Sequence, residues 1–522
     1  MSRTVGTSRQ IKNCLNMTSD LLGAQGFDFL VTYHTGLIRS RDDKPGSKMA
    51  SRAKPQRIRD PLHNLIEFDT TQFEQTIWRV IETEPFQRLR RVRQLGFSEF
   101  VFPGATHTRF AHSIGVFHTA RILIRTIQQK ASDKAHQAKV ALAAALVHDI
   151  GHGMFSHAFE DIGKQLDLPM AIHENVGDII VRNSTIKDIL NRELGRGFAD
   201  EVADVIKSKK PGNLFDAVVS SQFDADRLDY MQRDRLMTGV QGSGVDATWI
   251  LANLEIGTVP VAADEVSAGT VETLVLGPKA FYAAEHYVLS LFQLYPNVYF
   301  HKTTRGAEKL FSKLMTRIYG LIRDGAGDQC GLPKGHSIYE FFLDPSSVEK
   351  ALLLDDAVFW AALPLMKNAA DCVVSDCARR LRERKLLKCL DVRRRIEGRY
   401  PVRQGMSVED RREREARISL EVKTVMQKAE EVAAERSADQ KQILIDEDKR
   451  SPYKKFQDSQ TPLNQILIRQ AGGFEDMANL SSVVSSVESY EINRIYLCEE
   501  DEEGLAKMEG LVGKERREDR NA

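Results

Sequence analysis

Apolar residues dominate the segment from Ala135 to Val147, which is rich in alanine and leucine and contains neither glycine nor proline. Alanine and leucine have high helix propensity, and the last turns of the segment are almost wholly apolar, so we predict a helix buried on most of its faces. The polarity then changes abruptly, because His148, Asp149, His152 and His157 follow within ten residues. Two glycines in the same stretch permit a turn that returns the later histidines to the end of the helix.

A second helix is predicted to begin at Arg109, because apolar residues recur from there at helical spacing, at Phe110, Ile114, Phe117 and Ile124. Arg109 and His112 are three residues apart and therefore share one face of this helix. The two side chains are expected to point to the same side.

A third helix carries many acids on one face. Asp226, Asp229 and Tyr230 occupy positions i, i+3 and i+4, and Asp234 lies one turn further along. Such a face is either solvated or turned toward cations. Taken alone, the pattern favours a solvated face.

The rest of the chain divides by composition. Residues 1–50 are polar and weakly patterned, which predicts a disordered extension. Residues 54–330 are expected to form the helical core. At about 251–280, a glycine-rich segment with many β-branched residues predicts a β-hairpin insertion.

The C-terminal part is predicted to contain a charged helical region followed by a small α/β lobe. Residues 337–460 are expected to be helical and charged, with one charged helix over 407–450. Residues 461–522 predict a small α/β lobe with strands in 461–468 and 492–500, a helix over 502–512 and a frayed tail. The predicted fold class is mostly α, a helical core with a small β-hairpin insertion and a small α/β C-terminal lobe.

One stretch is strongly basic. Residues 379–399 contain ten Lys and Arg but three acids, a local charge of +7. Two interpretations are open: a solvated helix face, or a patch that contacts phosphates or nucleic acid.

Composition narrows the class of protein. A chain of 522 residues is too long for one average core, so two or three subdomains are expected. The net charge is zero, which gives no global attraction to nucleic acid or a membrane. Six cysteines without a paired CxxC predict free thiols in a reducing compartment. Because we find no run of 18 apolar residues and no leader pattern, we expect a soluble, cytoplasmic protein without a membrane partner.

In chain order, His112, the pair His148–Asp149, and Asp226 resemble the signature of the HD-domain metal-dependent phosphohydrolases. The local sequences HTRFAHSIGV, HDIGHGMFSHAFE and FDADRLDYMQRD are similar to those of deoxynucleoside triphosphate triphosphohydrolases. That subfamily includes bacterial dGTP triphosphohydrolases and the vertebrate sterile-alpha-motif HD enzyme. The resemblance spans about residues 54–320 and is closer to the bacterial members, because we see no sterile-alpha-motif domain.

The resemblance implies a divalent-metal site with the ligands His112, His148, Asp149 and Asp226. Two imidazoles and two carboxylates suit Mn²⁺, Mg²⁺ or Fe²⁺, whereas a structural zinc site is closed and usually rich in cysteine. Open positions on the metal bind a phosphate oxygen and a water, which the metal activates as a Lewis acid.

The resemblance also implies roles around the phosphates. Arg109 is expected at the α-phosphate, and His152 and His157 are the candidates for proton transfer. Glu160 is expected to orient His157, and His173 to line the phosphate site.

Further residues match positions that recognise nucleotides in the family. The expected substrate-binding set is Gln94 and Leu95 at the sugar, Arg227 at the outer phosphates, Tyr230 and Asp234 at the 3′-hydroxyl, and Tyr299 beside the base. Glu82, Gln87 and Arg90 match a pocket that holds an activating guanine nucleotide at a subunit interface. The chain is accordingly expected to be a homo-oligomer.

The implied reaction is attack at the α-phosphorus of a deoxynucleoside triphosphate, which gives deoxynucleoside and intact triphosphate. Two alternatives stay open. One is an HD phosphohydrolase for nucleoside monophosphates, cyclic nucleotides or nucleic-acid phosphodiesters. The other is a non-catalytic nucleotide- or nucleic-acid-binding protein that uses residues 379–399.

Overall fold

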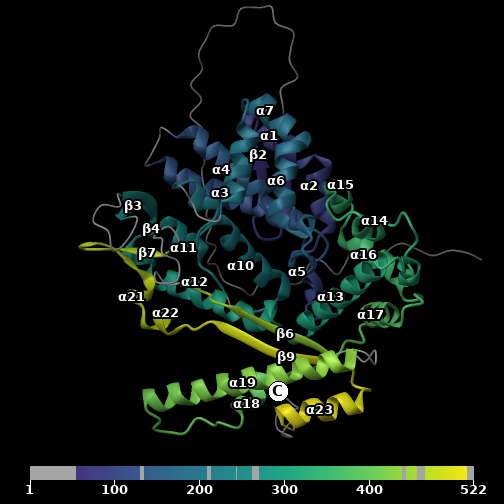
Figure 1. Cartoon of the computed structure of the whole chain (residues 1–522). Coiled ribbons are helices and arrows are strands. Elements are labelled where there is room, and N and C mark those ends of the chain that lie inside the picture. The colour runs from purple at the N-terminus through teal and green to yellow at the C-terminus, as the bar shows by residue number, and fades with distance from the viewer. Residues whose placement is uncertain are drawn as a thin grey trace, which may run out of the picture. The chain divides into compact units, whose positions relative to one another are not determined.

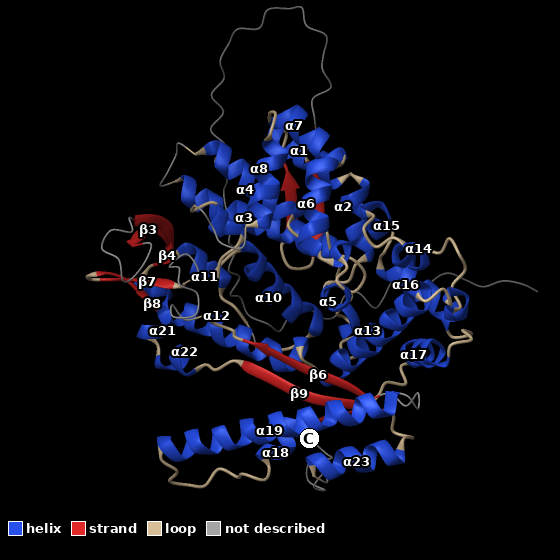
Figure 2. Ribbon diagram, in the orientation of Figure 1, coloured by secondary structure: helices blue, strands red, loops and turns tan. Residues whose placement is uncertain are grey.

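The computed structural model describes residues 54–129, 134–208, 213–242, 244–260, 270–437, 443–454 and 465–513. Helices dominate these residues, and the strands form three small sheets (Figure 2), so the predicted fold class is confirmed. The extension expected at residues 1–50 and the last nine residues of the tail lie outside the described residues.

The N-terminal half begins with an antiparallel hairpin that the sequence pattern did not predict, β1 (Gln56–Asp60) and β2 (Asn64–Phe68). Ten helices follow: α1 (Gln72–Ile81), α2 (Glu84–Arg88), α3 (Arg109–Gln128), α4 (Ala135–Val147), α5 (His157–Leu166), α6 (His173–Asn183), α7 (Thr185–Leu194), α8 (Phe198–Lys207), α9 (Asp216–Val219) and α10 (Ala225–Thr238). The helices predicted from Arg109 and over Ala135 to Val147 begin at the expected residues.

From Val140 onward, helix α4 is buried on almost all faces, as its composition predicts, whereas most of its first turn is exposed. One side packs with α1, α3, α6, α7 and α8, and the other with α3, α10 and α12 (Phe281–Leu294). Because α3 packs against both α4 and α10, the beginnings of α3 and α10 lie beside the end of α4. This packing places the three segments with candidate ligands together.

The middle of the chain adds α11 (Ala247–Ala252), the hairpin β3 (Leu254–Pro260) and β4 (Thr270–Leu276), and five helices after α12. The hairpin predicted at about 251–280 is therefore present. The five helices are α13 (Lys302–Arg323), α14 (Ser337–Leu343), α15 (Val348–Leu352), α16 (Asp356–Met366) and α17 (Cys372–Glu383). Helices α13, α14, α16 and α17 share one hydrophobic core with α5.

The C-terminal region contains β5 (Lys388–Asp391), α18 (Val392–Glu397), α19 (Val408–Ser437), β6 (Ile443–Arg450), β7 (Leu467–Gln470), β8 (Gly473–Asp476), α21 (Met477–Leu480), α22 (Ser482–Ser486), β9 (Tyr490–Leu497) and α23 (Glu502–Val512). The helix predicted over 407–450 is wrong at its end, because residues 443–450 form a strand that pairs with β9 along its whole length. The expected strands near 467 and 492 and the helix over 502–512 are present.

The C-terminal strands join two separate sheets. Strands β7 and β8 extend the β3–β4 hairpin, with β7 parallel to β4. Strand β9 lies between β5 and β6, and the long helix α19 runs along β9 and β6 (Figure 1). Ile495 and Leu497 face the helices α18, α19 and α23, whereas Tyr496 packs against Gly306 of α13. The last sheet is therefore docked on α13.

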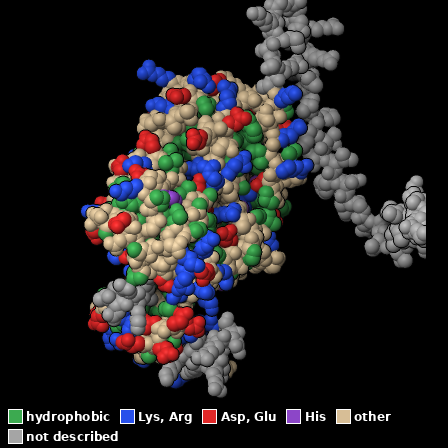
Figure 3. All heavy atoms as spheres, turned by 90° about the vertical axis from the view of Figure 1, so that its right-hand side faces the viewer, with side chains coloured by type: hydrophobic (Ala, Val, Ile, Leu, Met, Phe, Trp, Pro, Cys, Tyr) green, Lys and Arg blue, Asp and Glu red, His purple; other side chains and the backbone are tan. Residues whose placement is uncertain are grey.

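The basic stretch 379–399 is not one helix, because it spans the end of α17, β5 and α18. Several of its arginines bind other parts of the protein: Arg379 and Arg380 pair with Asp376, Arg384 donates to the Phe100 carbonyl, Arg393 pairs with Glu397 and Glu415, and Arg399 pairs with Glu421. On the face in Figure 3, Lys and Arg side chains are mixed with Asp and Glu. These contacts favour a solvated surface whose arginines pair within the protein over a patch that contacts phosphates or nucleic acid, although the stretch is not the single helix that was expected.

A search of the described helices for a span long and apolar enough to cross a bilayer finds none.

Gly151 provides a test of the packing around the turn after α4. A Cβ atom there would lie 2.0 Å from the backbone oxygen of His173 and 2.5 Å from the backbone nitrogen of Gly177. Because backbone atoms cannot move aside cheaply, Gly151→Ala is expected to destabilise the protein by about 1–3 kcal/mol. The measurement is the thermal unfolding midpoint. Gly320→Ala is the matched control, since no atom lies within 4 Å of its Cβ position in α13, and an unchanged midpoint in Gly151→Ala would contradict this packing.

Candidate active site

Four of the candidate ligands converge where α3, α4 and α10 meet. His112 Nε2 lies 3.0 Å from Asp226 Oδ1 and 3.5 Å from Asp149 Oδ2. His148 Nε2 lies 3.4 Å from Asp149 Oδ2 and 3.7 Å from Asp226 Oδ1. The ligand atoms of His112, His148 and Asp226 all lie within 4.8 Å of one another. The four side chains thus surround one small space.

The hydrogen bonds of the two imidazoles leave the inward nitrogens free to bind a metal. His148 Nδ1 lies 2.9 Å from the Ala145 carbonyl, so that nitrogen must carry the proton. His112 Nδ1 lies 2.9 Å from Asp229 Oδ2 and donates to this carboxylate in the same way. The Nε2 atoms of both histidines are buried without a hydrogen-bond partner. A divalent cation would satisfy these two nitrogens and two carboxylates together, so the donor set fits a metal.

The electrostatics also indicate a site built for positive charge. Burial lowers the pKa of His112 and of His148, but the neighbouring carboxylates raise both above the ordinary value. Burial raises the pKa of Asp149, yet Arg109 and the histidines hold it well below its usual range. Both carboxylates stay ionised, because the histidines also lower the pKa of Asp226 against the effect of burial.

Arg109 lies between the ligand cluster and the following turn. Its Nη1 donates to Asp149 Oδ2 at 2.5 Å and its Nε donates to Ser156 Oγ at 2.9 Å. The side chain is buried but lines the same cavity as Asp149. A fixed cation one turn from a ligand can contact a phosphate oxygen that binds the metal.

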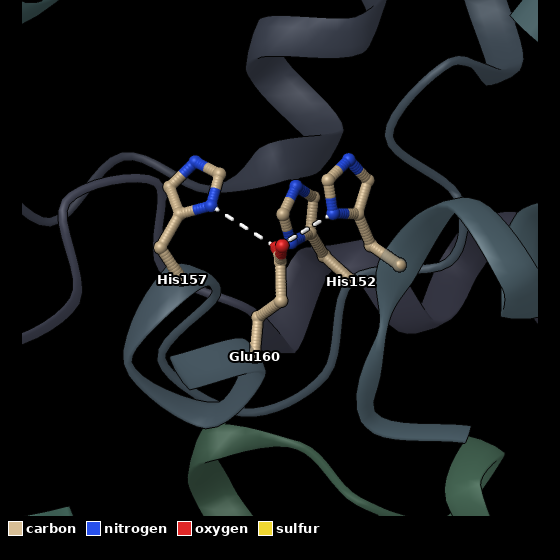
Figure 4. Close-up of side chains that lie close together, drawn as sticks. His152, His157 and Glu160 are labelled. Atoms are coloured by element: carbon tan, nitrogen blue, oxygen red, sulfur yellow. Dashed lines mark hydrogen bonds and ion pairs between the residues drawn. The ribbon is translucent and has the colours of Figure 1, made fainter. Parts of the chain in front are cut away.

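The predicted proton-transfer residues, His152 and His157, lie together with Glu160 in a second cluster (Figure 4). His173 Nδ1 lies 2.7 Å and His157 Nδ1 3.3 Å from Glu160 Oε2, so Glu160 contacts His173 more closely than His157. The ring of His152 stacks on that of His173, with centroids 4.0 Å apart. Burial raises the pKa of Glu160, but hydrogen bonds from the histidines and Lys164 hold it well below its usual range. Glu160 thus holds the rings of His157 and His173 in place.

This second cluster also has the spacing of a metal site, since its ligand atoms lie within 4.8 Å of one another. However, Lys164 Nζ already lies 2.7 Å from Glu160 Oε1 and neutralises that carboxylate. We therefore interpret the cluster as a hydrogen-bonded group of side chains. His152 is uncharged at neutral pH, because burial and the charges of Arg109 and His173 hold its pKa well below 6.5.

The turn between α4 and α5 is strained and held from outside. Phe155 and Ser156 have φ angles of 53° and 55°, which are uncommon for residues other than glycine. The backbone N–H of Phe155 donates to Asp356 Oδ1 at 2.7 Å, and the Phe155 ring stacks on Phe97 with centroids 4.0 Å apart. Ser156 Oγ donates to the Arg93 carbonyl at 2.9 Å. These contacts fix the turn that presents His152 and His157.

The predicted sugar-binding residues lie on another wall. Asp234 is buried, with Oδ1 2.8 Å from His107 Nε2, and its Oδ2 accepts a hydrogen bond from the Tyr299 hydroxyl at 2.9 Å. Burial, followed by the charge of Asp234, raises the pKa of Tyr299 well above its usual value, so the hydroxyl stays protonated. The rings of Tyr230 and Tyr299 lie in edge contact, with centroids 6.3 Å apart.

One cavity of about 620 Å³ connects these groups. The predicted residues that line it are Gln94, Leu95, Arg109, His148, Asp149, His152, His157, His173, Asp226, Tyr230, Asp234 and Tyr299. His112, Glu160 and Arg227 are not part of its lining. Arg227 lies at the start of α10, with Nε 3.8 Å from Asp224 Oδ2, and nothing in these contacts directs it to the outer phosphates.

The residues predicted to hold an activating nucleotide do not line this cavity. Arg90 donates to Gln87 Oε1 at 2.8 Å and lies over the Phe110 ring, whereas Glu82 accepts from the indole N–H of Trp78. Their proposed role in nucleotide activation stays a prediction.

Comparisons with known proteins agree with this geometry. The HD-domain family model matches residues 109–231, which contain His112, His148, Asp149 and Asp226. A Bacillus subtilis protein named as uncharacterized protein YwfO is 32% identical over 335 residues, which cover 64% of this chain and 71% of the relative. The chain belongs to the HD-domain family.

One further relative and one solved structure are also similar to the chain. A Dictyostelium discoideum protein named as a deoxynucleoside triphosphate triphosphohydrolase SAMHD1 homolog is 35% identical over 199 residues, 36% of this chain and 38% of the relative. The crystal structure of a Bacteroides thetaiotaomicron phosphohydrolase aligns with this chain with a TM-score of 0.61 and 24% sequence identity. The alignment covers 85% of this chain and 99% of the Bacteroides chain. The structural likeness shows the fold.

The HD-domain site also contains residues that the sequence analysis did not assign. Asp229 binds His112, and His107 binds Asp234. The sequence pattern places Asp229 on the acidic face of α10, but it does not predict that Asp229 contacts His112. Glu308, Asp448 and Arg450 line the cavity from α13 and β6, and no local signal could show that a strand more than 200 residues after Asp226 reaches the site.

The metal ligands can be tested without a substrate. Asp226→Asn removes an anionic ligand and keeps the shape of the side chain, so we expect the protein to lose its bound divalent ion, about one per chain. The measurement is Mn²⁺ binding to the purified protein. Asp161→Asn is the control, because Asp161 lines the cavity outside the ligand cluster. Equal Mn²⁺ binding by Asp226→Asn and the native protein would rule out this ligand set.

Proposed function

We propose that this HD-domain phosphohydrolase cleaves deoxynucleoside triphosphates to deoxynucleoside and triphosphate. Water forms a bond to the α-phosphorus, the bond between that phosphorus and the 5′-oxygen breaks, and the leaving oxygen takes up a proton. The observation that carries the proposal is the cavity itself. It joins the two-histidine, two-aspartate cluster to a histidine-rich wall on one side and to Asp234 with two tyrosines on the other.

The histidine-rich wall suits a chain of phosphates. His157, His173 and Lys164 line the cavity next to the ligand cluster, together with Arg109. These groups offer N–H donors and positive charge to phosphate oxygens. A divalent cation, when bound, supplies Lewis-acid activation of a phosphate oxygen and of the attacking water.

His157 is proposed to give the proton to the leaving 5′-oxygen. Its side chain is 69% exposed, so it can move and can regain a proton from solvent. Glu160 holds it through Nδ1 and leaves Nε2 directed away from the carboxylate. His152 is proposed to donate a neutral hydrogen bond to phosphate, because its low pKa keeps it uncharged.

The other wall suits a deoxyribose. Asp234 is fixed by His107 and Tyr299, so its carboxylate is oriented before a substrate arrives. An oriented carboxylate accepts a hydrogen bond from a sugar hydroxyl. Gln94 Oε1 is buried without a partner and lines the same cavity, so it offers a second acceptor. Leu95, Tyr230 and Tyr299 supply apolar surface for the sugar and base.

The likeness to a named deoxynucleoside triphosphate triphosphohydrolase supports this substrate class, over 36% of the chain. Activation by a guanine nucleotide and assembly into a homo-oligomer are proposed on the same resemblance. Assays should therefore include dGTP or GTP as an activator.

The first experiment is product analysis by ion exchange. With Mn²⁺ or Mg²⁺, the protein is expected to convert deoxynucleoside triphosphates to deoxynucleoside and intact triphosphate. Ribonucleotides are the matched control, since they differ at the 2′-hydroxyl near the proposed Asp234 and Tyr230 contacts. Monophosphate and pyrophosphate, or no cleavage with any activator, would contradict the proposal and favour another HD specificity.

A second experiment separates proton transfer from metal binding. His157→Gln is expected to lower turnover by roughly 10²–10⁴-fold, because the leaving oxygen loses its proton donor. Mn²⁺ binding should remain, since His157 is outside the ligand cluster. The comparison variant is His136→Ala, whose exposed ring pairs with Glu201 away from the cavity. If His157→Gln lost metal as well, the two clusters would have been assigned the wrong roles.

A further inference from the structure

A buried network of charges lies behind the metal ligand His112. At its centre is Asp229 of α10, which is completely buried. Its carboxylate accepts hydrogen bonds from His112 Nδ1 at 2.9 Å, from His63 Nε2 at 2.7 Å, and from Arg233 Nε and Nη2 at 2.7 and 3.0 Å. His63 lies in the turn between β1 and β2, before the residues 109–231 that match the HD domain.

The turn that carries His63 is itself fixed to the same network. Asp60, the last residue of β1, binds Arg233 through both oxygens, at 2.7 and 3.2 Å. Asp60 Oδ1 also accepts the backbone N–H groups of Leu62 and His63 at 3.0 and 2.9 Å. Asp60, Asp229 and Arg233 are buried, so each needs its partners. The hairpin and α10 therefore hold each other in position.

Gly115 of α3 shows how tightly this network is packed. A Cβ atom at Gly115 would lie 2.0 Å from Asp229 Oδ1 and 2.3 Å from Arg233 Nη2. Asp229 Oδ1 is the oxygen that His63 contacts. The carboxylate is therefore packed closely against α3, one turn from His112.

We propose that His63 is a positioning residue of the metal centre. His112 can bind a metal through Nε2 only when its proton is on Nδ1, and Asp229 Oδ2 selects that tautomer. His63, together with Arg233 Nη2, holds the other oxygen of Asp229 and so helps to fix the carboxylate in the plane that His112 needs. The inference rests on the metal centre of the proposed function and adds that the order of the β1–β2 hairpin and metal affinity are coupled.

Coupling of this kind acts in both directions. If an ordered hairpin strengthens metal binding, a bound metal must stabilise the hairpin by the same factor. The amide hydrogens of β1 and β2 therefore exchange more slowly when metal is bound. Because a bound metal also slows exchange throughout the fold, the coupling appears as slowing of these amides beyond that of amides far from the site.

The test is to measure Mn²⁺ binding to the full-length protein by titration calorimetry, without nucleotide. His63→Leu removes the donor and is expected to weaken Mn²⁺ binding roughly tenfold. His63→Gln retains an N–H donor and should restore most of the affinity. Arg57→Ala is the matched control, because it removes the exposed cross-strand pair with Glu67 in the same hairpin and should leave Mn²⁺ affinity unchanged.

The outcomes distinguish the two proposals. A native protein that binds no Mn²⁺ refutes the metal centre. A native protein that binds Mn²⁺, with folded His63→Leu binding it equally well, overturns only the role of His63. If His63→Leu does not fold, hydrogen exchange of the native protein decides: slowing of the β1 and β2 amides with Mn²⁺ beyond that of amides far from the site supports the coupling, and slowing no greater than theirs overturns it.

Discussion

The structure depends on one electrostatic demand, which is that two buried imidazole nitrogens lie only 3.0–3.7 Å from the oxygens of two carboxylates and all four groups need a common partner. His112 and His148 present unpartnered Nε2 atoms there, and Asp149 and Asp226 supply the negative charge. Burying such groups is costly unless they are paired. Three helices from distant parts of the chain must therefore meet closely. Gly115 of α3 lies where the side chains of Asp229 and Arg233 approach from α10, and Gly151, just after α4, lies against the backbone of α6.

The parts of the site that could be predicted from sequence are those with a local signal. Helical spacing and the change from apolar to polar residues placed His112, His148, Asp149 and Asp226 near the ends of helices, and the family motif joined them. Their partners were not predictable in this way. Asp229 belongs to the acidic face of α10, but only the fold shows that it contacts His112 and the hairpin residue His63.

In the C-terminal region, the local sequence pattern predicts the wrong secondary structure. Residues 443–450 are rich in charges, so they were read as a continuation of a charged helix, yet they form β6 because β9 offers a complete set of pairing partners. Asp446 is buried against Arg305 of α13, and Asp448 and Arg450 then reach the cavity. The reacting groups and this outer wall come from different parts of the chain. Substrate preference can therefore vary in β6 while the metal centre stays the same.

The strained turn at Phe155 and Ser156 limits the independence of the HD segment. The backbone N–H of Phe155 is satisfied by Asp356, and Ser156 by the Arg93 carbonyl, both outside residues 109–231. A fragment cut at those boundaries would leave these buried groups without partners, at a cost of about 1–3 kcal/mol each. The segment that matches the HD-domain model is thus smaller than the set of residues that holds its turn in place, and a graft of that segment alone would lack these two contacts.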